Sequence, residues 1–165
     1  MILGLNNITI KINQTLKNCK EMFYGLSNIT NIFFINFNTS SLTSTIDILR
    51  KRNNLMTIKF NNFDTSSVID MKYKFYYCNN LISLDLSNFN TSFVTSMTCM
   101  FQFCYNLISF NISNLLHHLL LVWIYMFMDF KYLIPLDLSN LDTSSINSLK
   151  DIEDILSGVN LNIIY

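Results

Sequence analysis

The stretch LISLDLSNFNTSFVTSM at residues 81–97 recurs along the chain with a spacing of 26 residues. Its core matches IKFNNFDTSSVIDM at 58–71, one period earlier, and LDLSNLDTSSINSL at 136–149, two periods later. A fixed period of this length predicts a solenoid, in which each unit covers the open apolar face of its neighbour. Apolar residues fill three slots in each of five copies: Ile29, Leu55, Leu81, Leu107 and Leu133; Ile32, Ile58, Leu84, Phe110 and Leu136; and Phe34, Phe60, Leu86, Ile112 and Leu138.

Within one unit the apolar spacing changes from that of a strand to that of a helix. Leu84 and Leu86 flank Asp85, which is the alternation of a half-buried strand. The polar turn SNFNTS follows, and Thr91 and Ser92 are suited to cap a helix. The next apolar residues are spaced as on one helix face: Val94, Met97, Met100, Phe101 and Cys104. We therefore predict an α/β solenoid of strand–turn–helix units, with a parallel sheet on one face.

The repeat places the whole chain, residues 1–165, in a single domain. Residues 1–21 match the repeat only in part and form a degenerate first unit, and five units then run from 22 to 151. Residues 152–165 read as a closing partial unit. Exposed ends of such a sheet favour self-association by edge pairing.

Composition excludes several classes of function. The formal net charge is zero and only 13% of residues are charged, so nothing favours a nucleic-acid partner. The most apolar stretch, LLLVWIYMFM at 119–128, is too short to span a bilayer. No secretion signal follows Met1, which leaves a cytoplasmic protein or a fragment as an alternative to a surface location.

No arrangement of residues in the sequence predicts catalysis, a metal or a cofactor. Ser and Cys nucleophiles lack a recognisable base and orienting acid, and no glycine-rich phosphate loop occurs. Cys78 and Cys104 share one slot and are expected to stack as buried thiols, although a disulfide between them stays open. We therefore expect a protein that is not an enzyme.

Two sets of polar residues recur with the repeat. One set is expected to be a structural ladder of buried asparagines that bond the backbone between coils: Asn36, Asn62, Asn88, Asn114 and Asn140. The other set points outward from the predicted sheet and is the candidate ligand-binding face: Lys59, Asp85, Asn111 and Asp137, flanked by Asn61, Ser87, Ser113 and Ser139. Solenoids commonly bind partners on such extended surfaces.

The segment LISLDLSNFNTSFVTSM is followed by MFQFC at 100–104. Together they resemble the repeat of the BspA-like leucine-rich-repeat surface proteins, which is common in Mycoplasma and Brachyspira surface lipoproteins. The family unit reads approximately MFxxCxxLxSLDLSNFDTSxVTxM, and the matching residues here include Met100, Phe101, Cys104 and Leu107. The resemblance implies a leucine-rich-repeat-type solenoid at the cell surface or outside the cell. It also implies a role in adhesion or recognition, with a protein or glycan on another surface as partner.

Some units depart from this pattern. The first has Phe33 in place of the strand aspartate, and the second has Arg52 in the slot of Cys78. At 116–124 the chain reads LHHLLLVWI, and our hypothesis is a frame-shifted stretch between two compensating insertions or deletions. The alternative to an adhesion protein is therefore a truncated or decayed repeat fragment without a binding function of its own.

Overall fold

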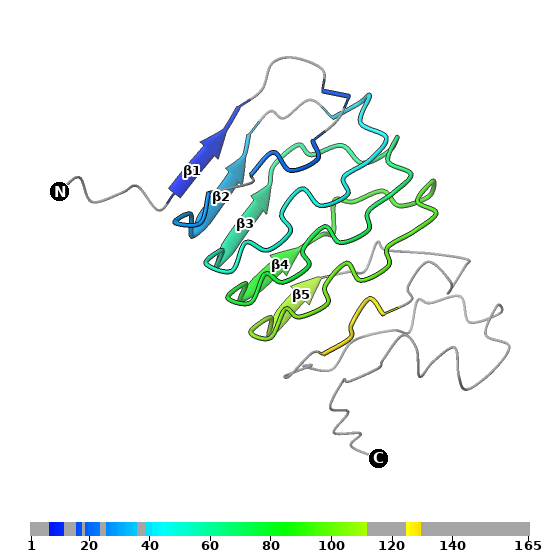
Figure 1. Cartoon of the computed structure of the whole chain (residues 1–165). Helices are drawn as coiled ribbons and strands as arrows, with labels where there is room; N and C mark the ends of the chain where they lie inside the picture. Colours follow the sequence, from blue (N-terminus) through cyan, green and yellow to red (C-terminus); the bar gives the residue numbers. More distant parts are fainter. Residues whose placement is uncertain are drawn as a thin grey trace, which may run out of the picture.

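The structure is a computed structural model, and it describes residues 7–11, 16–17, 19–23, 26–35, 39–111 and 125–129. Strands stack side by side in chain order and form one open, parallel, five-stranded sheet (Figure 1). The predicted parallel sheet is thus confirmed within the described residues. The strands are short: β1 (Asn7–Ile10), β2 (Asn31–Phe34), β3 (Thr57–Phe60), β4 (Ser83–Asp85) and β5 (Ser109–Asn111).

The pairing register of the strands equals the sequence period. Ile32 lies opposite Ile58, and Ser83 lies opposite Ser109, so equivalent residues of successive units are neighbours in the sheet. The expected alternation also holds, because Leu84 and Leu86 are buried while Asp85 between them is exposed. One coil of chain therefore adds one strand without a change of register.

Stacked phenylalanines run through the core between successive coils. The Phe34 and Phe60 rings lie 5.3 Å apart and nearly parallel, and the Phe75 and Phe101 rings lie 5.4 Å apart in the same way. Phe127 continues the second stack at 6.0 Å from Phe101. Such ring pairs add to the burial of apolar surface, at about 0.5 to 1.5 kcal/mol each.

The predicted helix is wrong for the described residues. Opposite the sheet, residues 45–52, 71–78 and 97–104 form runs of tight turns and contain no helix. We call this layer the turn ribbon. Its N–H groups alternate between two acceptors: Lys74 N bonds Met71 O in its own turn, whereas Phe75 N bonds Met100 O in the next coil. A helix would instead form its backbone bonds within its own segment, from each N–H to the carbonyl four residues earlier.

The turn ribbon satisfies backbone groups that a short helix would leave open. A helix of two turns has four unpaired N–H groups and four unpaired C=O groups, and it is marginal even when its sequence favours it. Stacking turns on turns pairs these groups between coils. The apolar spacing of Val94, Met97, Met100 and Cys104 fits either structure, since all four side chains are buried. Spacing alone could not separate the two.

The turns of the ribbon require left-handed backbone at regular places. Tyr73 and Tyr77 have φ of 54° and 61°, and one period later Cys99 and Phe103 have φ of 54° and 64°. A positive φ at the third position is typical of type II turns, and glycine usually occupies that position. Side chains at these positions cost about 1 kcal/mol each, which the bonds between coils offset.

A column of buried threonines bonds one coil to the next. Thr39, Thr65 and Thr91 are one period apart and almost fully buried. The Thr65 hydroxyl accepts a hydrogen bond from Asn90 N and donates one to Asn90 O, both at 2.8 Å. Thr39 donates in the same way to Asp64 O. Thr39 and Thr65 thus connect neighbouring coils, and Thr91, which the sequence suggested as a helix cap, belongs to the same column.

Replacing Thr65 with valine is expected to lower the free energy of unfolding by about 1 to 3 kcal/mol, because both backbone groups of Asn90 lose their partner. Urea denaturation measures the change. Thr95 is exposed, and its hydroxyl bonds Ile69 O at 3.2 Å, so Thr95→Val is a matched control with an expected change below about 0.5 kcal/mol. Equal losses in both variants would contradict the role of the threonine column.

The predicted burial of the asparagine ladder is wrong at the two described positions. Asn62 and Asn88 are exposed. Asn62 has a φ of 56°, a conformation that asparagine tolerates better than most residues. Side-chain amides in another slot bond the preceding coil: Asn54 donates to Ser27 O at 2.8 Å and Asn106 to Asn79 O at 2.9 Å. Asn36, Asn114 and Asn140 lie outside the described residues.

Candidate functional site

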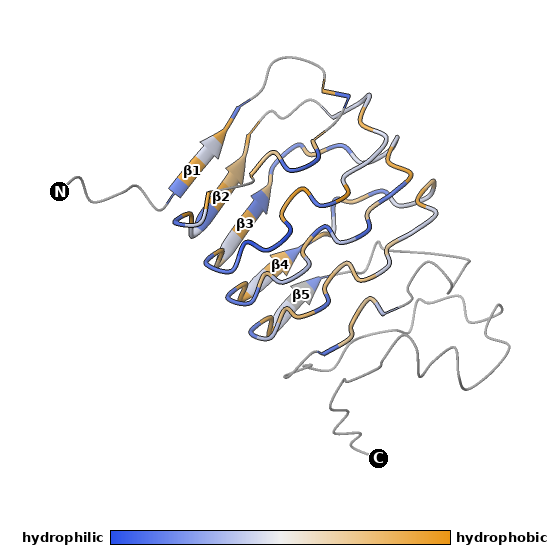
Figure 2. Cartoon of the chain, viewed as in Figure 1, coloured by the Kyte–Doolittle hydropathy of each residue, from blue (hydrophilic) through white to orange (hydrophobic). Residues whose placement is uncertain are grey.

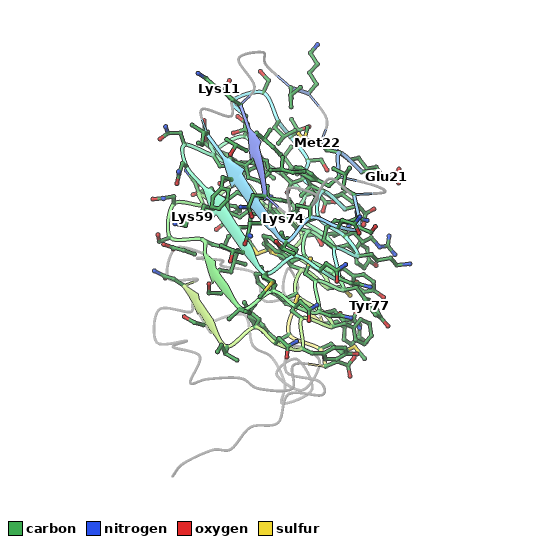
Figure 3. The ribbon with its side chains drawn as sticks, turned by 90° about the vertical axis from the view of Figure 1, so that its left-hand side faces the viewer. Lys11, Glu21, Met22, Lys59, Lys74 and Tyr77 are labelled. Atoms are coloured by element: carbon green, nitrogen blue, oxygen red, sulfur yellow. The ribbon has the colours of Figure 1, made fainter. Side chains whose placement is uncertain are left out.

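The outward face of the sheet carries the described residues of the predicted ligand-binding face. Lys59, Asp85 and Asn111 are exposed at equivalent positions of β3, β4 and β5. Lys59 points away from the core in Figure 3. Asn61 is also exposed and Ser87 is half-buried, whereas Asp137, Ser113 and Ser139 lie outside the described residues. The structure therefore brings the five described residues of the eight onto one surface.

Lys59 and Asp85 differ in how far they are engaged within the protein. The Lys59 ammonium forms no hydrogen bond or ion pair with any described residue, so it is free to pair with a ligand. One carboxylate oxygen of Asp85 accepts a hydrogen bond from Ser87 N at 2.9 Å. This bond fixes the carboxylate and leaves its second oxygen open to a partner.

A row of exposed aliphatic side chains lies where the chain enters the strands that carry these polar residues. Met56, Ile82 and Ile108 occur one period apart, immediately before or near the start of β3, β4 and β5, and are 42%, 39% and 43% exposed. Hydrophobic residues recur where the chain enters the strands (Figure 2). Sequence reasoning missed this row, although the 26-residue period contains it. Contiguous exposed apolar side chains are typical of interaction surfaces.

The thiols are structural and not nucleophilic. Cys78 and Cys104 are buried and free, and they donate to Leu49 O and Phe75 O, each at 3.1 Å. Burial raises the pKa of Cys78 to about 12, so its reactive thiolate form is scarce at neutral pH. The expectation of stacked buried thiols is confirmed. Arg52, in the same slot, likewise donates to the preceding coil through Phe23 O at 2.6 Å.

One lysine lies inside the core. Lys74 is fully buried, between the sheet and the turn ribbon (Figure 3). Its Nζ lies 4.8 Å from the centre of the Phe63 ring and 5.2 Å from that of Phe89, and it has no hydrogen-bond partner among the described residues. Burial lowers its pKa from the ordinary value of 10.5 to about 7, with a small opposing effect of Cys19. Sequence reasoning missed Lys74.

The described part of the chain contains no group of three or more His, Cys, Asp or Glu side chains placed to hold a metal ion. The same residues include no helix of the length and apolar character needed to cross a membrane. The outward surface of the sheet carries charged and amide side chains, with the aliphatic row at the entry to its strands.

Comparison with known families gives one match. Residues 17–119 match the model of the family described as "Mycoplasma protein of unknown function, DUF285". No curated protein and no solved structure shows a significant match. The matched segment covers most of the chain and contains strands β2 to β5 of the stacked sheet. The chain therefore belongs to the Mycoplasma DUF285 family.

Proposed function

We propose that this protein is a non-enzymatic recognition or adhesion module that binds a partner through the outward face of its sheet. The proposal includes a location at the cell surface or outside the cell, as the resemblance to BspA-like surface proteins suggests. The observation that supports it best is the exposed aliphatic row Met56, Ile82 and Ile108, at the entry to the strands that carry Lys59 and Asp85. An apolar row next to charges is the usual composition of a protein interface.

The geometry of the sheet favours an extended partner over a small molecule. Equivalent side chains repeat along the stack at the spacing of neighbouring strands, about 4.8 Å. A ligand that lies across several strands would meet the same chemistry in each coil, so weak contacts would add up. A protein surface or a glycan chain on another cell can provide such contacts. β1, with no second described neighbour, could also pair with another copy.

The test is a matched pair of substitutions on two surfaces. Ile82→Ser removes an aliphatic side chain from the proposed face, and Ile69→Ser removes an isoleucine of similar exposure, 47%, outside the strands. Both variants and the parent chain are applied to immobilised extracellular-matrix proteins and glycans in biolayer interferometry. Ile82→Ser is expected to weaken binding about tenfold, because one buried aliphatic contact is worth 1 to 2 kcal/mol. Ile69→Ser is expected to bind as the parent does.

Reversing the charge at Asp85 tests the polar half of the same face. Asp85→Lys should weaken the binding of a partner that uses both charges by tenfold or more, roughly the value of a charged hydrogen bond. Because an attractive ion pair is lost, added salt should weaken the remaining binding less than it weakens that of the parent chain. Circular dichroism must stay unchanged in each variant. Binding that survives Ile82→Ser and Asp85→Lys together, or that falls equally with Ile69→Ser, contradicts the proposal.

A further inference from the structure

A second surface with binding character lies on the turn ribbon, on the side away from the sheet. A cavity of about 250 Å³ opens there between Glu21 and the turn run 45–52. Glu21, at its rim, and Tyr77, further along the ribbon, lie on the side of the molecule opposite Lys59 (Figure 3). The lining residues are Glu21, Asp47, Ile48, Arg50, Lys51 and Arg52. This cavity is independent of the proposed adhesive face.

The Arg50 guanidinium is fixed in place at the cavity. Its Nη1 bonds the Asp47 carboxylate at 3.1 Å, and its central carbon lies 5.2 Å and 5.0 Å from the ring centres of Tyr73 and Tyr76. Its Nε is buried and has no hydrogen-bond partner among the described residues. A guanidinium held this way loses little entropy on binding, and it keeps donors that are not used within the protein.

The charge around the cavity favours an anion. Three lining residues are cationic and two are acidic. The Asp47 side chain is only 12% exposed and is paired, whereas the Arg50 side chain is 40% exposed. Lys51 is exposed and forms no ion pair with a described residue. The lining therefore has one net positive charge, and its solvent-exposed groups include Lys51 and part of Arg50 as well as the Glu21 carboxylate.

Aromatic rings continue from Arg50 along the ribbon. The rings of Tyr76 and Tyr77 lie 5.1 Å apart, those of Tyr77 and Phe103 lie 4.4 Å apart, and those of Phe103 and Tyr105 lie 5.9 Å apart. These four side chains are half-buried, so part of each ring is open to solvent. Rings of this kind pack against the C–H faces of pyranose sugars, and tyrosine hydroxyls bond sugar hydroxyls.

The backbone of the ribbon excludes recognition of a peptide by strand pairing. Lys51 N bonds Tyr76 O, and Tyr73 N bonds Thr98 O, so the main-chain groups beside the cavity are used between coils. A peptide added to a sheet needs such groups free. The cavity is also smaller than the 300 to 1,000 Å³ usual for drug-sized ligands, which suits one charged ring unit.

We propose that the cavity at Arg50 binds the carboxylate of an acidic sugar chain, whose next ring packs on Tyr76 and Tyr77. Arg50 would donate a charge-assisted bond to the carboxylate, and Lys51 would add a second positive charge. The chain would then bind two partners at once, one on the sheet and one on the ribbon. This inference does not depend on the identity of the partner at the sheet.

The probe is a trisaccharide of glucuronic acid, titrated into the full chain by isothermal calorimetry, with a neutral glucose trisaccharide and a triglutamate peptide in parallel. Saturable binding of the acidic sugar alone is the expected result, and it should weaken as salt is raised. Arg50→Gln should weaken it about tenfold or more, the value of a charged hydrogen bond. Lys11→Gln, an exposed lysine elsewhere on the surface, is the matched control and should leave it unchanged.

Three results would overturn the inference: no binding of the acidic sugar, equal binding of the neutral sugar, or equal or tighter binding of the peptide. Tyr77→Leu separates the two parts of the site, because the rings that hold Arg50 are those of Tyr73 and Tyr76, and it should weaken the trisaccharide more than free glucuronate. Ile82→Ser on the sheet should not affect the sugar. A failure of the adhesive face and a failure of the sugar site are therefore distinguishable.

Discussion

Replacing Lys74 with methionine is expected to raise the free energy of unfolding at pH 7 by about 3 to 5 kcal/mol. The side chain lies where equivalent units have Ile48, Met100 and Met126, all buried and apolar. Methionine therefore already occupies the equivalent position in two later coils of the stack. Because the substitution removes an amine without a partner, it should improve the core instead of disturbing it.

The surroundings of Lys74 decide the size of the effect. Four ring centres lie within 6 Å of Nζ, those of Phe60, Phe63, Phe75 and Phe89. Ring faces stabilise an ammonium by about 2 kcal/mol when water is excluded. Removing a full charge from water costs several kcal/mol more than this. The cost of removing the charge from water exceeds the stabilisation by the rings, so the pKa of Lys74 falls to about 7.

The same lysine makes stability depend on pH. Its pKa is about 7 in the folded chain and 10.5 in the unfolded chain, so between these values the unfolded chain binds a proton that the folded chain does not. The penalty that Lys74 imposes on folding is therefore complete below pH 7. It shrinks by about 1.4 kcal/mol for each pH unit as the pH rises toward 10.5. A total of about 5 kcal/mol is involved.

The buried thiols act in the opposite direction above pH 9. Burial raises the pKa values of Cys19, Cys78, Cys99 and Cys104 from the ordinary value of 9.0. The unfolded chain therefore loses thiol protons that the folded chain keeps, and stability falls as pH rises. For the parent chain we expect maximal stability near pH 8 to 9, measured as the urea midpoint in reducing buffer.

The difference between the Lys74→Met variant and the parent chain reports mainly on the lysine, because Cys78, Cys99 and Cys104 contribute equally to both and only Cys19 interacts with Lys74. This difference should shrink by about 3 kcal/mol between pH 7 and pH 9. Lys72→Met is the matched control: its side chain is 42% exposed and pairs with Asp70 at 3.4 Å, so we expect a change below about 1 kcal/mol. A constant difference at all pH values would show that Lys74 is not buried as a neutral amine.

The sequence predicts the strands well and the rest of each unit less well. Strand alternation around Asp85 and the 26-residue register depend on one-face burial, which a sequence pattern records directly. The turn ribbon depends on bonds between coils, and its buried residues are spaced as on a helix face. Nothing in the spacing of Met97, Met100 and Cys104 distinguishes the two, so the helix prediction failed.

The polar columns show a similar limit. Recurrence of Asn62 and Asn88 marks them as structural, but recurrence does not tell whether a side chain is buried or stands at a turn with a positive φ. Thr65 recurs equally well, and its single hydroxyl both donates and accepts within a narrow gap between coils. Lys74 was detectable, since a cation stands alone in a column of Ile and Met. The Arg50 cavity was not, because it combines residues from two coils with different sequences.

Replacing Leu84 with aspartate is expected to unfold the stack, with a loss of at least about 5 kcal/mol. Leu84 is 3% exposed in the middle of β4, and its burial alone is worth about 2 kcal/mol. An unpaired carboxylate there adds several kcal/mol, and a domain of this size has only about 5 to 15 kcal/mol in total.

The matched control for Leu84→Asp is Ser83→Asp, which places the same carboxylate one residue away on the exposed face of the same strand. We expect it to change stability by less than about 0.5 kcal/mol, as measured by thermal unfolding. Because the strands of neighbouring coils share one register, a charge at Leu84 faces the core beside β3 and β5 as well. The destabilisation should therefore extend to the neighbouring coils, and the variant should show no cooperative thermal unfolding transition. Equal tolerance of the two aspartates would be incompatible with a sheet that buries only one of its faces.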